Sequence, residues 1–420
     1  MINMMSAARA PGRNALFFIF ITILINMIGF GVIMPVMPDL VMEVTGLGRS
    51  EAARWGGLLS MAYAVMQFIM MPVMGSLSDR YGRRPIILGS LAAYSFDFLL
   101  MALAPSIAVL LAARILAGSF AATFTTANAY IADISPPEKR AANFGLMGAA
   151  FGLGFIIGPA LGGIIGDEFG HRAPFYAVSA LGFINLIYGW IFLPETHAKE
   201  NRRAFDWRRA NALGAFRHFR QYPVILPIAL TMFLYQLAHW AFPSVWAYFA
   251  GERFGWSPKQ IGFSLMAVGL TSALVQGGLT RIVMPKFGER KAAFFGASVA
   301  VIAYLGYGVV PEGWMIYPLI AFGALAGFTA PALQGIMSRT VPADAQGQLQ
   351  GAIGSINGVS MIIGPLMMTQ IFAAFSGKDA AVYLPGAPFL VASLLTALAI
   401  IPLFAAIGKI QRPRIATAQP

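Results

Sequence analysis

Two residues of opposite charge, Asp97 and Arg114, stand inside long apolar stretches of this sequence. Twelve residues separate Pro85, near the start of one stretch, from Asp97, which corresponds to about 18 Å along a helix. Eight residues separate Ser106 from Arg114, or about 12 Å from the opposite side of a hydrocarbon layer about 30 Å thick. The two side chains are therefore expected at the same depth. The short connection 104–106 favours a helical hairpin that brings them together.

Charged side chains inside a membrane are costly and are functional by default. Burial in lipid favours the neutral form of a carboxyl group, whereas a nearby guanidinium favours its ionised form. A conformational change that alters the distance between the two groups would thus bind and release a proton. We therefore predict that Asp97 carries a proton and that Arg114 is its partner. The alternative is a static ion pair that serves only the structure.

Other polar residues within apolar stretches are candidates for proton coupling or substrate binding. His239, close to Gln236, has a side chain that titrates near neutral pH, although a buried histidine is often only hydrogen-bonded. Amides and aromatic rings in an apolar cavity are typical of small-molecule sites, and each amide serves equally well as an interhelical hydrogen bond. The candidate cavity residues are Asn26, Gln67, Phe151, Phe155, Tyr235, Gln236, Gln276, Gln334 and Asn357.

The composition indicates a membrane protein that is not an enzyme. Of 420 residues, 58% are hydrophobic and 11% are charged, which is far more apolar than a soluble domain. The sequence has no cysteine, and its four histidines show no metal-ligand spacing. Neither a set of nucleophile and base nor a phosphate-binding loop is recognisable. We expect no metal and no cofactor, and a proton gradient as the source of energy.

Apolar runs of spanning length recur along the whole chain and predict an all-α integral membrane fold with twelve transmembrane helices. The first run is too long for the core of a signal peptide and is expected to be retained. The predicted spans lie near 15–38, 55–76, 85–104, 106–132, 144–166, 173–193, 223–250, 259–283, 292–310, 315–340, 349–374 and 386–408.

The basic residues set the expected orientation. If the N-terminus is cytoplasmic, 22 of the 29 Lys and Arg residues fall on the cytoplasmic face and six on the other, with Arg114 inside a span. The positive-inside rule then places both termini in the cytoplasm of a bacterium, with the chain crossing the inner membrane many times. The net charge of +12 thus reflects topology and does not indicate binding to nucleic acid.

The segment 194–222 is the longest polar stretch and mixes basic with aromatic residues. It is either an amphipathic helix on the anionic inner leaflet or a solvated linker. We expect it to divide the chain into an N-terminal six-helix bundle (1–193), a cytoplasmic linker (194–222) and a C-terminal six-helix bundle (223–420).

A shift of 206 residues superposes the two parts of the chain. Such a repeat predicts duplication into two pseudo-symmetric halves with a substrate cavity between them near the middle of the membrane. Alternating access would then be a rocking of the halves. The residues that coincide are Gly82, Arg84, Pro136, Gly145, Gly148, Gly152, Ile156, Ile157, Gly158 and Pro159 with Gly288, Arg290, Pro342, Gly351, Gly354, Gly358, Ile362, Ile363, Gly364 and Pro365.

Two motifs carry a family resemblance. The loop 75–84 resembles the signature loop of the major facilitator superfamily, which implies a role in conformational gating. The alternative is that this loop is a cytoplasmic turn whose basic residues only reflect the positive-inside rule. We expect Asp79 to cap a helix and to pair with a basic residue such as Arg140. The predicted gating residues are Gly75, Asp79, Arg80, Gly82, Arg83, Arg84, Asp133 and Arg140.

The second motif, 154–163, resembles the antiporter motif of the drug/proton antiporter branch of that superfamily. Small residues at these spacings let helices approach closely, and a proline inside the helix produces a bend. A close-packed interface without a transport role is the alternative. The motif residues are Gly154, Gly158, Pro159, Gly162 and Gly163.

Nearly the whole chain is similar to the tetracycline/proton antiporter group. The segments 29–38, 66–68, 131–133 and 331–335 carry this likeness. Three positions depart from it. Asn26 stands where the group has an acidic residue, Ser272 replaces a histidine, and Ala300 replaces an aspartate. The proton and metal–tetracycline chemistry of the second half is therefore expected to be absent, which argues against tetracycline itself as a substrate.

Together these features predict proton-coupled efflux of hydrophobic or amphipathic small molecules by alternating access. The expected partners of the monomer are a small-molecule substrate, protons and membrane lipids. An alternative is uptake or facilitated exchange of an endogenous metabolite on the same fold, and another is a receptor without transport activity. With a single basic side chain in the predicted cavity, a polyanionic substrate is disfavoured.

Overall fold

The structure is a computed structural model that describes residues 13–121, 123–203, 205 and 225–411. Throughout these residues the regular secondary structure is helical. Eleven of the helical stretches are long and apolar enough to cross a membrane, which agrees with the multi-pass fold expected from the apolar runs.

The first part of the described chain holds seven α-helices. Residues Ile107–Ile134 form one apolar stretch of spanning length that contains two of them, α4 and α5. The helices are α1 (Arg13–Thr45), α2 (Arg49–Tyr81), α3 (Arg83–Leu103), α4 (Ile107–Ser119), α5 (Thr123–Ile134), α6 (Pro137–Phe169) and α7 (Ala173–Phe192), followed by the short η1 (Lys199–Asn201).

The second part alternates long α-helices with short turns of other helical types. The elements are α8 (Ile225–His239), α9 (Ala241–Phe254), α10 (Pro258–Leu274), the π-helical η3 (Val275–Leu279), α11 (Thr280–Val309), η4 (Gly313–Met315), α12 (Ile316–Gly323), the 3₁₀-helical η5 (Ala324–Phe328), α13 (Thr329–Thr340), η6 (Ala343–Ala345), α14 (Gln346–Ser376) and α15 (Ala387–Gln411).

One continuous helical stretch, Pro258–Val309, has 52 residues, which is about twice the length that a bilayer requires. Gly288 interrupts it with φ 79° and ψ 156°, so that two helices meet there. Gly82 separates α2 from α3 with φ 107° and ψ 166°. Glycine adopts such positive φ angles without the steric cost that other residues have. The internal repeat therefore has the same backbone turn at both of these equivalent positions.

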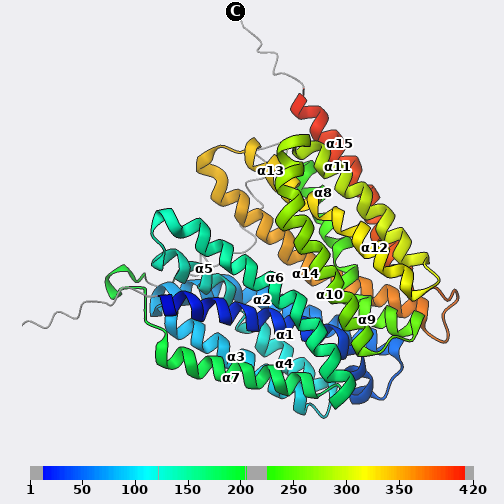
Figure 1. Ribbon diagram of the computed structural model, residues 1–420, viewed down its shortest axis with the longest axis horizontal. Coiled ribbons are helices and arrows are strands. Elements are labelled where there is room, and N and C mark those ends of the chain that lie inside the picture. Colours follow the sequence, from blue (N-terminus) through cyan, green and yellow to red (C-terminus); the bar gives the residue numbers. More distant parts are fainter. Residues whose placement is uncertain (1–12, 122, 204, 206–224, 412–420) are drawn as a thin grey trace, which may run out of the picture.

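The two groups of helices, α1–α7 and α8–α15, meet near α9 and α10 and diverge toward α5 and α13 (Figure 1). We call the end that carries the α1–α2 turn, residues 46–48, the outer end, and the end that carries Gly82 the inner end. At the outer end the groups are joined by hydrogen bonds and an ion pair. Ser50 Oγ donates to the carbonyl of Ala373 at 2.9 Å, and Lys259 Nζ lies 3.3 Å from Glu168 Oε1.

Nearer the inner end, parts of α6 and α14 lie clear of neighbouring atoms. A Cβ added to Gly152 of α6 or to Gly354 of α14 would meet no atom within 4 Å. A Cβ added to Gly163, nearer the outer end of α6, would collide with the carbonyl of Pro258 at the start of α10. Among the described residues, the two groups of helices are thus in close contact at the outer end, and contacts between them extend as far as Phe68 of α2 and Gly358 of α14.

Candidate functional site

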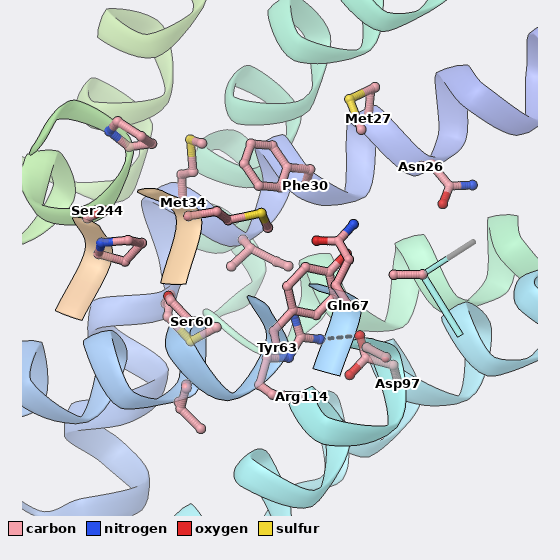
Figure 2. Close-up of a pocket in the computed structure, with 18 of the residues that line it drawn as sticks. Asn26, Met27, Phe30, Met34, Ser60, Tyr63, Gln67, Asp97, Arg114 and Ser244 are labelled. Carbon is pink, nitrogen blue, oxygen red and sulfur yellow. Dashed lines mark hydrogen bonds and ion pairs between the residues drawn. The ribbon is translucent and has the colours of Figure 1, made fainter. Parts of the chain in front are cut away.

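A cavity of about 430 Å³ lies between the two groups of helices, which is the size of a site for a drug-like molecule. Residues of α1 to α6 form one side, and residues of α9, α10 and α14 form the other. Most of the wall is apolar, and methionines and aromatic rings such as Met34 and Phe30 are prominent in it (Figure 2). Flexible methionine side chains suit a site that must fit ligands of different shapes.

Asp97 of α3 and Arg114 of α4 lie in contact in the cavity wall. Arg114 Nη2 donates to Asp97 Oδ2, and the two side chains are 9% and 3% exposed, respectively. Among the residues that line the cavity, these two are the charged ones. The structure thus brings together the two charges that the spacing along the sequence places at one depth.

Each partner of this pair retains a polar atom that the pair does not satisfy. Asp97 Oδ1 and Arg114 Nε are buried without a hydrogen-bond partner, as are Gln67 Oε1 and Ser90 Oγ in the same wall. A buried polar group without a partner costs free energy. Since these atoms belong to cavity-lining residues, a ligand or water molecule in the cavity can complete their hydrogen bonding.

Two tyrosines complete this polar wall. Tyr63 lies beside Gln67 and the ion pair (Figure 2), with the Arg114 guanidinium 5.8 Å from its ring centroid. Tyr94 donates its hydroxyl proton to the carbonyl of Ile25 at 2.8 Å. Sequence reasoning missed both tyrosines. The available signal was spacing, because Tyr63 precedes Gln67 by four residues and Tyr94 precedes Asp97 by three, so each pair shares a helix face.

Three of the predicted cavity residues, Asn26, Gln67 and Phe151, line this cavity. Phe155 lies behind its wall, where its ring stacks on that of Phe30 with 6.4 Å between the centroids. The ring that lines the cavity at this place is therefore that of Phe30.

The other predicted cavity residues lie outside the set that lines the cavity. Tyr235 is buried and donates to the carbonyl of Ala326 at 3.0 Å. Gln236 Nε2 donates to Asn357 Oδ1 at 2.8 Å, which joins α8 to α14 as an interhelical hydrogen bond. Gln276 and Gln334 are exposed.

His239 is the last residue of α8. It is exposed and lies outside the set of cavity-lining residues. The structure therefore separates this histidine from the Asp97–Arg114 pair with which it was grouped.

The predicted gating loop contains an ion-pair network centred on Arg83. Arg83 Nη1 donates to Asp79 Oδ1 at 2.6 Å, and its Nε donates to Asp133 Oδ2 at 3.3 Å. Asp79 thus pairs with Arg83 and not with the expected Arg140. Arg83 follows Asp79 by four residues, and the turn at Gly82 directs its side chain toward the Asp79 carboxylate. Arg140 donates to the backbone carbonyl of Ala132 at 3.3 Å.

Glu195 supplies the helix cap that Asp79 was expected to supply. Its carboxylate accepts hydrogen bonds from the backbone N–H groups of Arg83 at 2.9 Å and Arg84 at 3.2 Å, at the start of α3. A carboxylate at this position satisfies N–H groups that a helix leaves free and interacts favourably with the helix dipole. Sequence reasoning missed Glu195, although its place directly after a span was visible.

The chain after Glu195 remains attached to the gating loop. Thr196 Oγ1 donates to Asp133 Oδ2 at 3.3 Å, and the N–H of Arg203 donates to the carbonyl of Asp79 at 3.3 Å. Residues at both ends of the segment 194–203, the first ten residues of the predicted linker, therefore contact the gating residues Asp79 and Asp133. Residues 206–224 lie outside the described residues, so the amphipathic helix expected there remains a prediction.

The remaining gating residues lie around this network. Arg84 Nη2 donates to the carbonyl of Trp190 at 2.6 Å. The guanidinium of Arg80 lies 5.1 Å from the ring centroid of Tyr81. A Cβ added to Gly75 would have no atom within 4 Å, so the inner part of α2 is open there.

The glycines of the predicted antiporter motif pack α6 against its neighbours. A Cβ added to Gly158 would lie 2.5 Å from the carbonyl oxygen of Ile28 in α1, and one added to Gly162 would lie 2.7 Å from that of Val32. Gly154 faces the same helix, whereas Gly163 faces α10. Pro159 lies inside α6, between these glycines. The motif thus lets α1 and α10 approach the backbone of α6.

Among the described residues, no group of three or more His, Asp or Glu side chains is arranged to hold a metal ion. The sequence also contains no cysteine. The charged groups in the cavity wall are the carboxylate of Asp97 and the guanidinium of Arg114.

Comparisons with known proteins agree with this arrangement. Residues 19–365 match the model of the Major Facilitator Superfamily. The tetracycline resistance protein, class C, of Escherichia coli is 39% identical over 86% of this chain and 90% of its own length. The class H protein of Pasteurella multocida is 34% identical over 92% and 96%, respectively.

A bacterial homologue of the human lysosomal transporter Spinster, solved in an inward-facing and unoccupied conformation, has the same fold. Its TM-score is 0.78 at 18% identity, over 93% of this chain and 96% of that chain. With this fold, the match to the family model and the identity to the tetracycline resistance proteins, the chain belongs to the major facilitator superfamily and is a membrane transporter, not an enzyme.

Proposed function

We propose that this protein exports hydrophobic or amphipathic small molecules in exchange for protons. The observation that carries the proposal is the Asp97–Arg114 pair in the wall of an otherwise largely apolar cavity between the two groups of helices. The names of the relatives, which are tetracycline resistance proteins, support drug efflux. The proton gradient is the energy source, and the monomer acts in the bacterial inner membrane with both termini in the cytoplasm.

The proposed architecture has twelve spans in two six-helix halves, 1–193 and 223–420, joined by the linker 194–222. The break at Gly288 supports it, because it divides the 52-residue helical stretch into two helices. The matching turn at Gly82 supports the pseudo-symmetry of the halves. With this topology the inner end faces the cytoplasm, and the contacts at the outer end correspond to an inward-facing state.

Proton coupling in this proposal depends on competition between a proton and Arg114 for the carboxyl group of Asp97. When Asp97 is ionised, Arg114 holds it in the ion pair. Protonation of the carboxyl group removes its charge and weakens that contact, which frees the guanidinium to bind water or to stack on Tyr63. A proton taken up from the outer side is released to the cytoplasm when the pair re-forms.

The substrate would contact the polar wall formed by Tyr63, Gln67 and the ion pair, while the methionines and Phe30 enclose its apolar part. Asn26 lies in the cavity wall where the tetracycline group has an acidic residue. Because Asp97 is the one carboxylate among the cavity-lining residues, we expect the substrate to bind without a bridging metal ion, since divalent ions require several oxygen ligands.

Transport in inverted membrane vesicles with an imposed pH gradient tests the proposal. Tetracycline, ethidium and rhodamine 6G serve as probes, and empty-vector vesicles are the baseline. We expect at least one probe to accumulate when the vesicle interior is acidic and to leave when the gradient is collapsed. Accumulation that ignores the gradient would refute proton coupling, and movement of sugars or organic acids but no probe would favour metabolite exchange.

A further inference from the structure

Helices α3 and α5 are antiparallel, because α3 begins at the inner end and α5 ends there. Arg83 Nε of α3 lies 3.3 Å from Asp133 Oδ2 of α5, and this ion pair fixes how the residues of the two helices align. Each step along α3 away from Arg83 is matched by one step back along α5 from Asp133. Two turns on, about 10.5 Å from the ion pair, Ser90 therefore lies level with Thr126, and both are on the same helix faces as the pair.

The hydroxyl groups of these two residues have no hydrogen-bond partner. Ser90 is 2% exposed and Thr126 is 1% exposed, and both hydroxyl oxygens are buried. Serine and threonine in helices commonly donate to the carbonyl four residues earlier, as Ser95 of α3 does to Leu91 at 2.9 Å. Two facing hydroxyls that leave this bond unmade are suited to an internal water molecule, because it can serve as the partner of both.

Toward the cavity, the same alignment leads to Asp97. Thr123 of α5 lies level with position 93 of α3, between Ser90 and Asp97. All three of these residues line the cavity. Successive levels are three or four residues apart, or about 4.5–6 Å, which is a gap that bridging water molecules can span.

Toward the inner end, the alignment leads to carboxylates at the surface. Tyr130 follows Thr126 by one turn of α5 and donates its hydroxyl proton to the carbonyl of Pro194 at 3.0 Å. The next residue, Glu195, is exposed, and the side chain of Asp133 is 28% exposed. We call Asp97, Thr123, Ser90, Thr126 and Tyr130 the polar row.

The second half keeps the contact between the equivalent helices without most of these polar groups. Arg339 Nη2 of α13 lies 3.0 Å from Glu289 Oε1 of α11, at the positions that the shift of 206 residues assigns to Asp133 and Arg83. The same shift assigns Ala303, Thr329, Gly296, Ala332 and Ile336 to the five positions of the polar row. Packing of the two helices therefore does not require the row, of which only Thr123 has a hydroxyl counterpart.

A substrate bound at the polar wall of the cavity would cover Asp97 from the cavity side, since that wall includes the ion pair. Exchange of a substrate for a proton at this shared place then requires a separate exit for the proton.

We propose that the hydroxyl groups of Ser90 and Thr126, bridged by water, relay the proton from Asp97 to the inner end between α3 and α5. In each step an oxygen accepts one proton and passes its own proton on, so that only a proton leaves and no hydroxyl remains charged. The inference rests on the proton exchange of the proposed function and adds its exit route.

Stopped-flow mixing tests the proposal. Purified protein is mixed with a saturating concentration of the probe that the vesicles transport, whether tetracycline, ethidium or rhodamine 6G, which are all fluorescent. Probe fluorescence reports binding, and an indicator dye reports proton release. Thr126→Val removes the hydroxyl at nearly constant volume, and Thr126 lies outside the set of cavity-lining residues. We expect this variant to bind the probe at the parent rate and to release the proton about 100-fold more slowly, the lower limit of what a positioned proton-transfer group contributes.

Three controls separate a relay from a structural role. Thr126→Ser keeps the hydroxyl and should release the proton at the parent rate. Thr396→Val alters a fully buried threonine of α15 and should also behave as the parent. After a pH jump without the probe, water in the open cavity reaches Asp97 directly, so Thr126→Val and the parent should lose the proton equally fast. Ser90→Ala, at the facing hydroxyl, should show the same delay as Thr126→Val and provides a second test if that variant does not fold.

Two results would overturn the proposal. One is release by Thr126→Val or Ser90→Ala that keeps pace with probe binding as in the parent. The other is an equal delay in Thr396→Val or in the pH jump without the probe, because the substitutions would then act through the fold in general. Failure of the proposed function has a different signature, because the parent itself would then release no proton when the probe binds.

Discussion

Gly262→Ala should shift the protein from its inward-facing to its outward-facing state. A Cβ added to Gly262 of α10 would collide with the carbonyl oxygen of Pro159 in α6 and lie 3.2 Å from the Cα of Gly163. These are backbone atoms, which cannot move aside as the end of a side chain can, so α6 and α10 must separate.

The expected size of this shift follows from the cost of overpacking. An extra methyl group in a well-packed contact costs about 1–3 kcal/mol. The contact joins the two halves at their outer end, so the cost applies only while that end is closed. The ratio of inward-facing to outward-facing molecules should then fall by about 5- to 150-fold.

Thiol labelling from outside the cell measures the shift. Ser60 lines the cavity from α2, and Ser60→Cys can be the sole cysteine of the chain. A membrane-impermeant maleimide should label this cysteine faster when Gly262→Ala is present. Gly152→Ala in α6 is the matched control, because an added Cβ there meets no atom within 4 Å.

Equal labelling in the parent and in Gly262→Ala would show that the contact between α6 and α10 does not hold the outer end closed. An equal increase in Gly152→Ala would also refute the reasoning, because the effect would then come from a methyl group anywhere in these helices.

Three further predictions address the gating loop and the cavity. Glu195→Ala should lower thermal stability in detergent by about 1 kcal/mol through loss of the α3 cap, whereas Glu200→Ala, in η1, should have no effect; equal losses would exclude the capping role. Gln67→Leu should raise the KM of transport several-fold, since it removes a cavity hydrogen-bonding group; an unaltered KM would exclude substrate contact. EDTA should leave transport of the selected probe unchanged in vesicles, and loss of transport that Mg²⁺ restores would contradict metal-free binding.

The membrane class of the fold could be read from the sequence, because only about 20 apolar residues are needed to cross a bilayer. The contact between Asp97 and Arg114 was also within reach. A short hairpin fixes the depth of both residues, and oppositely charged side chains within membrane helices usually form pairs. The antiporter glycines were recognisable because small residues at regular spacing indicate close helix contacts.

The side that each helix presents to the cavity could not be read in the same way. A membrane helix is apolar all round, so its sequence has little of the amphipathic pattern that identifies the inner face of a soluble helix. Gln276 and Gln334 were for that reason grouped with Gln67, although the structure places them outside the cavity wall. The interhelical role of Gln236 was an open alternative that only its contact with Asn357 could distinguish.

The partners within the gating loop required the structure for another reason. The Arg83 side chain reaches Asp79 and Asp133 because Gly82 turns the chain sharply between α2 and α3. Glu195 reaches the start of α3 because the chain returns there after α7. Both contacts depend on how helices assemble, and neither residue type nor spacing along the chain specifies that.

Release of protons on substrate binding tests the central claim most directly. Purified protein in weakly buffered detergent solution would be titrated with the probe selected in vesicles, and the pH change recorded with an indicator dye. Parent protein should release up to about one proton per bound substrate, because one carboxyl group lies in the cavity wall, and Asp97→Asn should bind the probe and release none. Release by Asp97→Asn that equals that of the parent would contradict the assignment of proton coupling to Asp97.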